Sequence, residues 1–273
     1  MIYGVKKVIA WGVRAVRRIF HPTRSWLDIR ETDIGIADLP PEFEGYRIAQ
    51  FSDLHFDGVV TTAARFRELV DAINASKVDL IAFTGDFVTK GIPYRLDDLI
   101  PPLRDLHAPD GKVAIMGNHD HRLNTALIRR VIHESGMIDL DNTFYTIQRG
   151  DQVLHIAGVD SLLVRQARLD LVLRQLPETG PAILLAHEPD FANVGAATKR
   201  FAVQLSGHTH GGQIRIPLLT LLLLRNLNPR FMPRALMAGD MLLYINRGIG
   251  TVGLPIRFRC PSELTLITLR AAG

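Results

Sequence analysis

The sequence predicts an α/β protein built around a largely parallel sheet. Apolar runs of strand length end in polar residues at 46–55, 78–86 and 113–120, and a helical pattern follows the first run. Such alternation is typical of parallel sheets, whose strands end along one edge, so we expect these polar residues to be neighbours in space. The chain has 273 residues, 47% of them hydrophobic and 22% charged, which is ordinary for a globular protein with a large core.

The expected strands and helices follow one another without a linker after Pro40 and Pro41. A helix is predicted over residues 62–76, where Phe66, Leu69 and Ile73 recur at helical spacing. The other patterned segments are a hairpin over 143–149 and 152–159, a helix over 165–176, and strands over 182–186, 201–205, 241–245 and 264–269. Because no low-complexity tract divides them, we predict one catalytic domain over residues 25–273.

Residues 1–24 differ in composition and predict a basic amphipathic helix. Apolar residues recur at helical spacing from Ile2 to Phe20, and the segment holds six basic residues and no acidic residue. Its longest apolar stretch, residues 8–13, is far shorter than the roughly 20 residues that cross a bilayer. We therefore expect this helix to lie on an anionic membrane surface; the alternative is a helix docked on its own domain.

The charge distribution argues against a nucleic-acid-binding domain. The formal net charge is +4, from 32 basic and 28 acidic residues. Without the six basic residues of segment 1–24, 26 basic residues face 28 acidic ones, a net charge of about −2. The single cysteine, Cys260, excludes an internal disulfide and a cysteine metal site and indicates a reducing compartment. We predict no nucleic-acid partner and a cytoplasmic protein attached peripherally to the inner face of the cell membrane.

The polar residues at the strand ends suit metal ions. They are Asp53, His55, Asp86, Asn118, His119, His187, His208 and His210. Carboxylate, imidazole and amide ligands without a thiolate favour Mn, Fe or Zn. Even without His119, the other seven exceed what one ion accepts from a protein, whereas two ions that share a bridging carboxylate use them all, and Asp86 suits that bridge. Taken alone, His208 and His210 would equally suit a solvated polar loop.

The same residues fall into five short blocks whose order resembles that of the calcineurin-like metallophosphoesterases. The blocks are Asp53-Leu54-His55, Gly85-Asp86, Gly117-Asn118-His119-Asp120, His187 and Gly207-His208-Thr209-His210. The resemblance covers residues 46–210 and implies a four-layer α/β/β/α sandwich of two mixed sheets flanked by helices. It also implies two ions, one held by Asp53, His55, Asp86 and His210, the other by Asp86, Asn118, His187 and His208.

Two divalent metal ions in one site suit the hydrolysis of phosphate esters. Such ions lower the pKa of a bridging water and neutralise the phosphoryl group, so that hydroxide attacks phosphorus in line with the leaving oxygen. His119 is placed to stabilise or protonate that oxygen, a task for a group that titrates near neutrality. We expect Asp120 to orient His119. The predicted activity is a metal-dependent phosphodiesterase or pyrophosphatase with His119 and Asp120 as catalytic residues.

An apolar run at residues 216–224 bears on the substrate. It is too short to span a bilayer and forms either an exposed element that binds a lipid tail or a buried core helix. The chain is similar to the membrane-associated prokaryotic branch of the family, which includes phosphodiesterases and UDP-2,3-diacylglucosamine pyrophosphatases of lipid A biosynthesis. This similarity implies a lipid-linked phosphodiester or pyrophosphate. Hydrolysis of UDP-2,3-diacylglucosamine would give UMP and a lipid monophosphate.

Two other functions are compatible with the sequence. One is a phosphodiesterase of soluble small molecules or nucleotides, and the other is a metal-binding scaffold without turnover. A dinucleotide site is not expected, although residues 248–253 match G-x-G-x-x-G, because Pro255 leaves no helix to receive a pyrophosphate. We expect these glycines to shape a loop beside the metal site.

Overall fold

The computed structural model describes residues 26–89, 96–216 and 234–272. The segment 1–24, for which a membrane-surface helix is predicted, and residues 217–224 of the apolar run lie outside these ranges. None of the helices in the described ranges is both long and apolar enough to cross a membrane.

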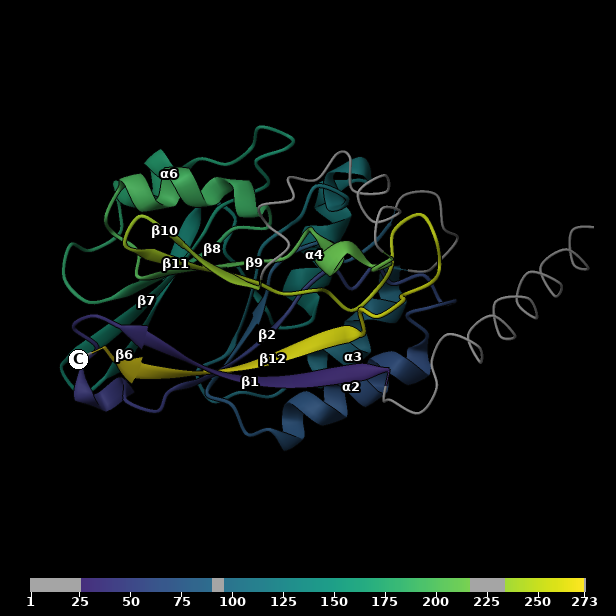
Figure 1. The fold of residues 1–273 in the computed structure, drawn as a ribbon, viewed down its shortest axis with the longest axis horizontal. Helices are drawn as coiled ribbons and strands as arrows, with labels where there is room; N and C mark the ends of the chain where they lie inside the picture. Colours follow the sequence, from purple (N-terminus) through teal and green to yellow (C-terminus); the bar gives the residue numbers. More distant parts are fainter. Residues whose placement is uncertain (1–25, 90–95, 217–233, 273) are drawn as a thin grey trace, which may run out of the picture.

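Two six-stranded mixed sheets face each other at the centre of the molecule (Figure 1). The first contains, in spatial order, β1 (Leu27–Ile36), β12 (Ser262–Ala271), β2 (Arg47–Phe51), β3 (Leu80–Phe83), β4 (Lys112–Ala114) and β5 (Ile138–Asp139). The second contains β10 (Ala235–Ala238), β11 (Met241–Ile245), β9 (Val203–Ser206), β8 (Ala182–Leu185), β7 (Gln152–Gly158) and β6 (Thr143–Arg149). Strands β2 to β5 run parallel, as do β7, β8, β9 and β11.

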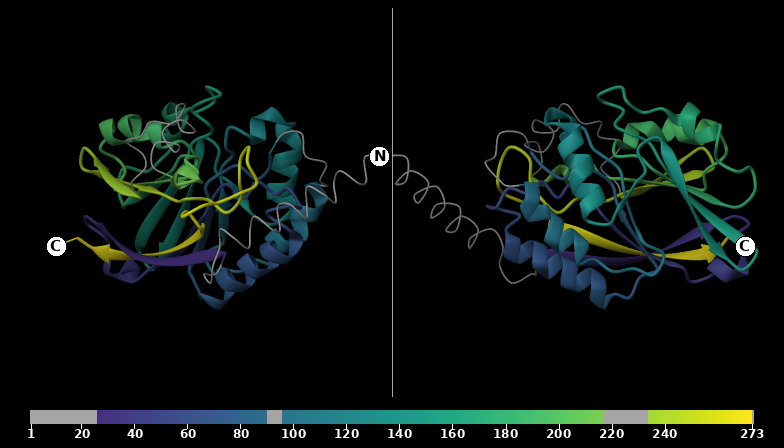
Figure 2. Two further views of the ribbon diagram at one scale, coloured as in Figure 1. Left: turned by 45° about the vertical axis from the view of Figure 1, so that its right-hand side comes forward. Right: turned by 180° about the vertical axis from the view of Figure 1, so that it is seen from behind.

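Helices cover the outer face of each sheet, which gives four layers (Figures 1 and 2). The first sheet is covered by α2 (Ala63–Ala75), α3 (Ile100–Arg104) and α4 (Thr125–Glu134), and the second by α5 (Leu169–Leu173) and α6 (Ala192–Ala197). Short 3-10 helices occur in the connections: η1 (Pro41–Phe43), η2 (Leu96–Leu99), η3 (Asp120–Arg122), η4 (Pro189–Phe191) and η5 (His210–Gly212). The predicted α/β/β/α sandwich of two mixed sheets is confirmed.

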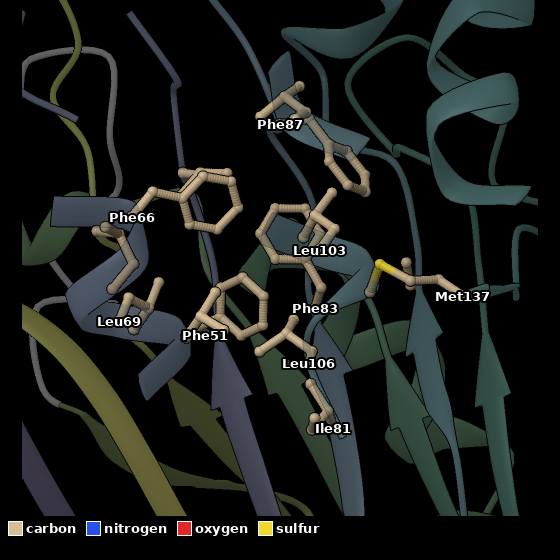
Figure 3. Close-up of a cluster of buried hydrophobic side chains, with 14 of the residues drawn as sticks. Phe51, Phe66, Leu69, Ile81, Phe83, Phe87, Leu103, Leu106 and Met137 are labelled. Atoms are coloured by element: carbon tan, nitrogen blue, oxygen red, sulfur yellow. The ribbon is translucent and has the colours of Figure 1, made fainter. Parts of the chain in front are cut away.

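The central strands are apolar on both faces because each face packs against a different layer. On β3, Ile81 and Phe83 belong to the cluster beneath the helices of the first sheet, while Leu80 and Ala82 pack between the two sheets. Figure 3 shows the first of these clusters, in which the ring centroids of Phe51 and Phe83 lie 4.8 Å apart. Burial on both faces explains why these strands appear in the sequence as continuous apolar runs.

Several elements differ from the sequence prediction. The patterns do not predict β1, β5 or β10; along β1, buried residues are interspersed with charged ones, and Ile29 is 49% exposed. The helix predicted over residues 165–176 is only the short α5. Arg165, at its predicted start, has a φ of 60°, which is left-handed and incompatible with an α-helix of L-residues.

Replacing Leu185 with alanine tests the inter-sheet core. Leu185 lies on β8 in the cluster between the sheets and is completely buried. We expect Leu185→Ala to lower the free energy of unfolding in urea by about 2–5 kcal/mol, since it leaves a cavity that the rigid sheets cannot fill. The matched control is Leu173→Ala on α5, where the side chain is 38% exposed and the loss should be clearly smaller. Equal losses in the two variants would contradict this account of the core.

Candidate metal centre

The predicted ligands lie where strands of both sheets end. They follow β2 (Asp53, His55), β3 (Asp86), β4 (Asn118), β8 (His187) and β9 (His208, His210). Six of them form two groups, each with ligand atoms within 4.8 Å of one another: Asp53 with His55 and His210, and Asp86 with His187 and His208. The two sheets therefore bring the residues of separate sequence blocks into one place.

The first group is a buried carboxylate with two imidazoles. The Nε2 atoms of His55 and His210 lie 3.1 Å apart, and Nε2 of His210 lies 3.3 Å from Oδ1 of Asp53. The side chains of Asp53 and His55 are fully buried. One ligand atom of each residue lies within 4.8 Å of the other two, close enough to bind a common metal ion.

The second group lies beside the first, and its Asp86 contacts a residue of the first group. Oδ2 of Asp86 lies 3.2 Å from Nε2 of His187, and Nδ1 of His208 lies 3.3 Å from that same Nε2. Oδ2 of Asp86 is also 3.4 Å from Nε2 of His55, which belongs to the first group. Asp86 is thus positioned between the two groups, where a bridging carboxylate belongs.

Hydrogen bonds fix which nitrogen of two rings faces the centre. Nδ1 of His187 lies 2.7 Å from the backbone oxygen of Thr84, which can only accept, so Nδ1 carries a proton and Nε2 is the nitrogen left for a metal ion. Nδ1 of His55 lies 2.6 Å from the hydroxyl of Thr89. Neutral imidazoles with a free Nε2 are the form that binds divalent cations.

Asn118 supplies a further test of whether the site fits metal ions. Its side-chain oxygen is buried and has no hydrogen-bond partner among the described residues. A buried amide oxygen without a partner is costly unless something binds it. Because Asn118 also lines the cavity that Asp86 and His208 enter, its oxygen suits a cation of the second group. The residues therefore fit the predicted pair of divalent ions.

The cluster has strong internal electrostatic coupling. Burial opposes charge on Asp53, but the neighbouring imidazoles of His210 and His55 lower the pKa of Asp53 well below its usual value. Burial likewise opposes charge on His187, yet the carboxylates of Asp86 and Asp53 raise the pKa of His187 well above its usual value. Two carboxylates that stay ionised inside the protein need compensating positive charge. Metal ions supply it when they are bound, and protonated histidine supplies it when they are not.

Most of the ligands have strained backbones. Positive φ values place five of them in the left-handed region: Asp53 (49°), His55 (40°), Asp86 (63°), His208 (68°) and His210 (52°). Each such residue costs roughly 1–2 kcal/mol, so the surrounding structure must hold it in place. Part of that support is visible: the backbone N–H of His208 donates to Oδ2 of Asp53 over 3.0 Å, and that of His119 to Oδ1 of Asp86 over 2.8 Å. The sequence carries no direct signal of this strain.

The glycines of the sequence blocks are needed because the ligands pack against them. A Cβ on Gly117 would lie 2.2 Å from Oδ1 of Asp86, and one on Gly248 would lie 2.6 Å from Cβ of Asp53. Gly250 similarly approaches Cβ of His55, at 2.7 Å. The glycines of segment 248–253 thus line the metal site, as expected from the sequence, although the sequence did not identify their contacts.

His119 and Asp120 have different surroundings from those expected. Nδ1 of His119 is buried without a hydrogen-bond partner among the described residues, and burial lowers the pKa of this ring to about 4. The ring is therefore neutral near pH 7, rather than titrating there. The carboxylate of Asp120 accepts from the backbone N–H groups of Asp86 (3.0 Å), Gly117 (2.9 Å) and Val88 (3.3 Å). Asp120 thus holds the loops that carry Asp86 and Asn118, and it makes no hydrogen bond to His119 in the described part of the chain, so its orienting of His119 stays a prediction.

Arg257 is a residue beside the site that sequence reasoning missed. It is buried, and its guanidinium donates to the backbone oxygens of Gly250 and Arg247, each over 2.8 Å. Its Nη2 lies 3.4 Å from Nδ1 of His210. Arg257 thus ties the glycine loop to a predicted metal ligand. No motif marks it, because only the fold brings residue 257 next to residue 210.

A cavity of about 480 Å³ opens over the cluster. The polar residues of its lining, here called the polar wall, include Asp86, Asn118, His119, His208 and His210. The apolar residues of its lining, called the apolar wall, are Leu163, Ile214, Val252 and Leu254. A substrate in this cavity would contact both candidate metal-binding side chains and hydrocarbon.

Gly207→Ala tests the requirement for glycine at the ligands. A Cβ there would lie 1.9 Å from Oγ of Ser52 and 2.4 Å from Oδ2 of Asp53, so the Asp53 carboxylate must move. We expect metal content after dialysis against Mn²⁺ to fall by on the order of tenfold, since overpacking costs about 1–3 kcal/mol at the ligand. Gly35→Ala is the control, because its Cβ would meet only Ala272 at an ordinary 3.4 Å. Wild-type metal content in Gly207→Ala would show that the close approach is unimportant.

Comparison with known proteins places the chain among phosphoesterases. The model of the calcineurin-like phosphoesterase family matches residues 46–212. The uncharacterized metallophosphoesterase YkuE of Bacillus subtilis (strain 168) is 34% identical over 248 residues, covering 90% of this chain and 86% of the relative. A transmembrane protein with a metallophosphoesterase domain from Danio rerio is 28% identical over 256 residues, covering 89% of this chain and 57% of the relative.

A solved structure with a similar fold is the sulfate thiohydrolase SoxB of Thermus thermophilus in complex with glycerol. It aligns with a TM-score of 0.48 and 12% identity over 85% of this chain and 58% of that chain. The family match spans more than half of the chain and contains all the predicted ligands. The chain belongs to the calcineurin-like phosphoesterase family and is a metal-dependent phosphoester hydrolase of a family that uses a dinuclear divalent metal centre.

Proposed function

We propose that this protein hydrolyses a phosphodiester or pyrophosphate bond in a lipid-linked substrate at a membrane surface. UDP-2,3-diacylglucosamine is the most specific candidate. The observation that supports a lipid-linked substrate is the mixed lining of the cavity, in which the apolar wall lines the same space as the candidate metal-binding residues. Domain organisation is part of the proposal: residues 1–24 bind the inner face of the cell membrane, and residues 25–273 form the catalytic domain.

The residues that would hold two divalent cations follow from the two groups. Asp53, His55 and His210 would hold one ion, Asn118, His187 and His208 the other, with Asp86 shared. Bound there, two divalent cations neutralise phosphoryl oxygens and lower the pKa of water, and Mn, Fe and Zn all suit the ligand set.

His119 is the residue we assign to the leaving oxygen. It lines the cavity next to Asn118 and Asp86, and its ring is neutral near pH 7 because burial lowers its pKa to about 4. A neutral ring stabilises a developing oxyanion by donating a hydrogen bond. Asp120 is a positioning residue, since its carboxylate fixes the backbone at Asp86 and Gly117.

The apolar wall suits the hydrocarbon part of a lipid. Leu163 and Leu254 line the cavity and are 59% and 51% exposed, which is unusual for large apolar side chains beside a polar site. Covering them with an acyl chain removes apolar surface from water on both partners. The Danio rerio relative, named as a transmembrane protein with a metallophosphoesterase domain, is consistent with a membrane setting.

Asp86→Asn tests the shared carboxylate. We expect the variant to bind less Mn²⁺ and to hydrolyse bis(p-nitrophenyl) phosphate at least ~100-fold more slowly, because both ions lose a charged ligand. Metal content by elemental analysis and release of p-nitrophenol are the measurements. His133→Ala is the control, since His133 is exposed on α4. An Asp86→Asn enzyme as fast as the wild type would rule out the dinuclear mechanism, and a metal-loaded wild type without turnover would favour a scaffold.

Leu254→Asp tests the lipid proposal. A charge on the apolar wall should lower kcat/KM for UDP-2,3-diacylglucosamine in detergent micelles by on the order of tenfold or more, since acyl chains avoid buried charge. Hydrolysis of bis(p-nitrophenyl) phosphate should be nearly unchanged. Val194→Asp provides the control, because Val194 is 48% exposed on α6 and does not line the cavity. An equal effect of Leu254→Asp on both substrates, or efficient hydrolysis of soluble diesters alone, would instead favour a soluble substrate.

A further inference from the structure

An arginine that lines the cavity has no side-chain partner in the described part of the chain. Arg122 is the last residue of η3, lines the cavity together with His119, and is exposed. Its backbone N–H donates to the oxygen of His119 over 3.0 Å, so its position on the loop is fixed relative to that residue. No carboxylate among the described residues pairs with its guanidinium.

Other arginines nearby in the chain are paired. Nη2 of Arg129 lies 3.2 Å from Oδ2 of Asp141, and Nη2 of Arg130 lies 2.5 Å from Oδ1 of Asp97. Arg122 differs from them in lying at the cavity rather than over the helices. An unpaired guanidinium beside a substrate cavity is available to an anionic part of the substrate.

The balance of charge around the cavity favours a substrate that carries more than one negative group. Asp86 is the one carboxylate among the described residues that line the cavity. Its Oδ1 accepts a hydrogen bond from the backbone N–H of His119, and its Oδ2 lies near Nε2 of His55 and of His187. Two divalent cations would outweigh the two carboxylates of Asp53 and Asp86, and Arg122 adds another positive charge. A plain phosphodiester carries one negative charge, whereas a diphosphate diester carries two on adjacent phosphoryl groups.

We propose that Arg122 binds the second phosphoryl group of a diphosphate diester and thereby selects this substrate class over plain phosphodiesters. The guanidinium fork suits two phosphoryl oxygens at once. This inference rests on the proposed phosphodiester or pyrophosphate hydrolysis and narrows it to the pyrophosphate bond.

The reaction at such a substrate is a simple hydrolysis. The oxygen of water forms a bond to one phosphorus, and the bond between that phosphorus and the bridging oxygen breaks. The products are two phosphate monoesters, and the protons of water are released to solvent at neutral pH. Arg122 next to His119 would contact the phosphoryl group that leaves, so its positive charge is matched to the charge that develops there.

A matched pair of soluble esters tests the proposal. The p-nitrophenyl ester of thymidine 5′-monophosphate has one phosphoryl group, and the p-nitrophenyl ester of thymidine 5′-diphosphate has two. Cleavage at the thymidine-linked phosphorus releases thymidine 5′-monophosphate from both, so one chromatographic assay measures both with the Mn²⁺-loaded full chain. The wild type should prefer the diphosphate ester in kcat/KM.

Arg122→Ala should reduce this preference by on the order of tenfold through slower hydrolysis of the diphosphate ester alone, because a charged hydrogen-bonding group is lost. Arg122→Lys should retain part of the preference for the diphosphate ester, since lysine keeps the positive charge but lacks the planar guanidinium that donates to two oxygens at once. Metal content and the urea midpoint should match the wild type, because Arg122 is exposed and unpaired. Arg174→Ala, at a 73% exposed side chain beyond α5, is the control and should change neither ester.

Two results would overturn the inference. If Arg122→Ala slows both esters equally, or neither, Arg122 does not recognise a second phosphoryl group, while phosphodiester hydrolysis itself stands. If the wild type with bound Mn²⁺ hydrolyses neither ester nor bis(p-nitrophenyl) phosphate, the proposed function fails and the inference fails with it.

Discussion

Two buried carboxylates, Asp53 and Asp86, set the conditions that the rest of the site must meet. Both stay ionised despite burial because imidazoles and backbone N–H groups surround them. Buried negative charge on this scale is stable only with compensating positive charge. The shared position of Asp86 makes the two ligand groups one unit, so the loss of either group leaves the other with unbalanced charge.

The rigid sandwich holds the strained loops of this site in place. Five ligands have left-handed backbones, and the loops that carry them pack against glycines with no room for a Cβ. Loops can hold strained conformations when the strands before them are rigid. Here β2, β3 and β4 are buried on both faces, and β8 and β9 face them across the inter-sheet core. Asp120 bonds the loop after β3, and Arg257, from the loop after β11, contacts His210 in the loop after β9.

The cavity combines three kinds of surface that are seldom found together. Candidate metal-binding side chains form its polar wall, Leu163 and Leu254 belong to its apolar wall, and Arg122 lines it without a side-chain partner in the described part of the chain. A phosphorylated amphiphile has matching parts. The polar wall accounts for the reaction class that the family shares, while the apolar wall and Arg122 are features by which a member can choose its substrate.

The sequence alone determined the fold class and predicted the candidate ligands and their order, because buried parallel strands appear as continuous apolar runs and the candidate ligands follow directly after them. It could not reveal β1, whose charged residues interrupt its apolar pattern, nor the short α5, which depends on the backbone at Arg165. Only the tertiary structure revealed the contacts of Asp120, Gly248 and Arg257 and the unpaired side chain of Arg122 among the described residues. Each depends on contacts, or on the lack of a partner, between segments far apart in the chain. The local sequence pattern indicates which face of a strand or helix is buried, but not which distant residue packs against that face.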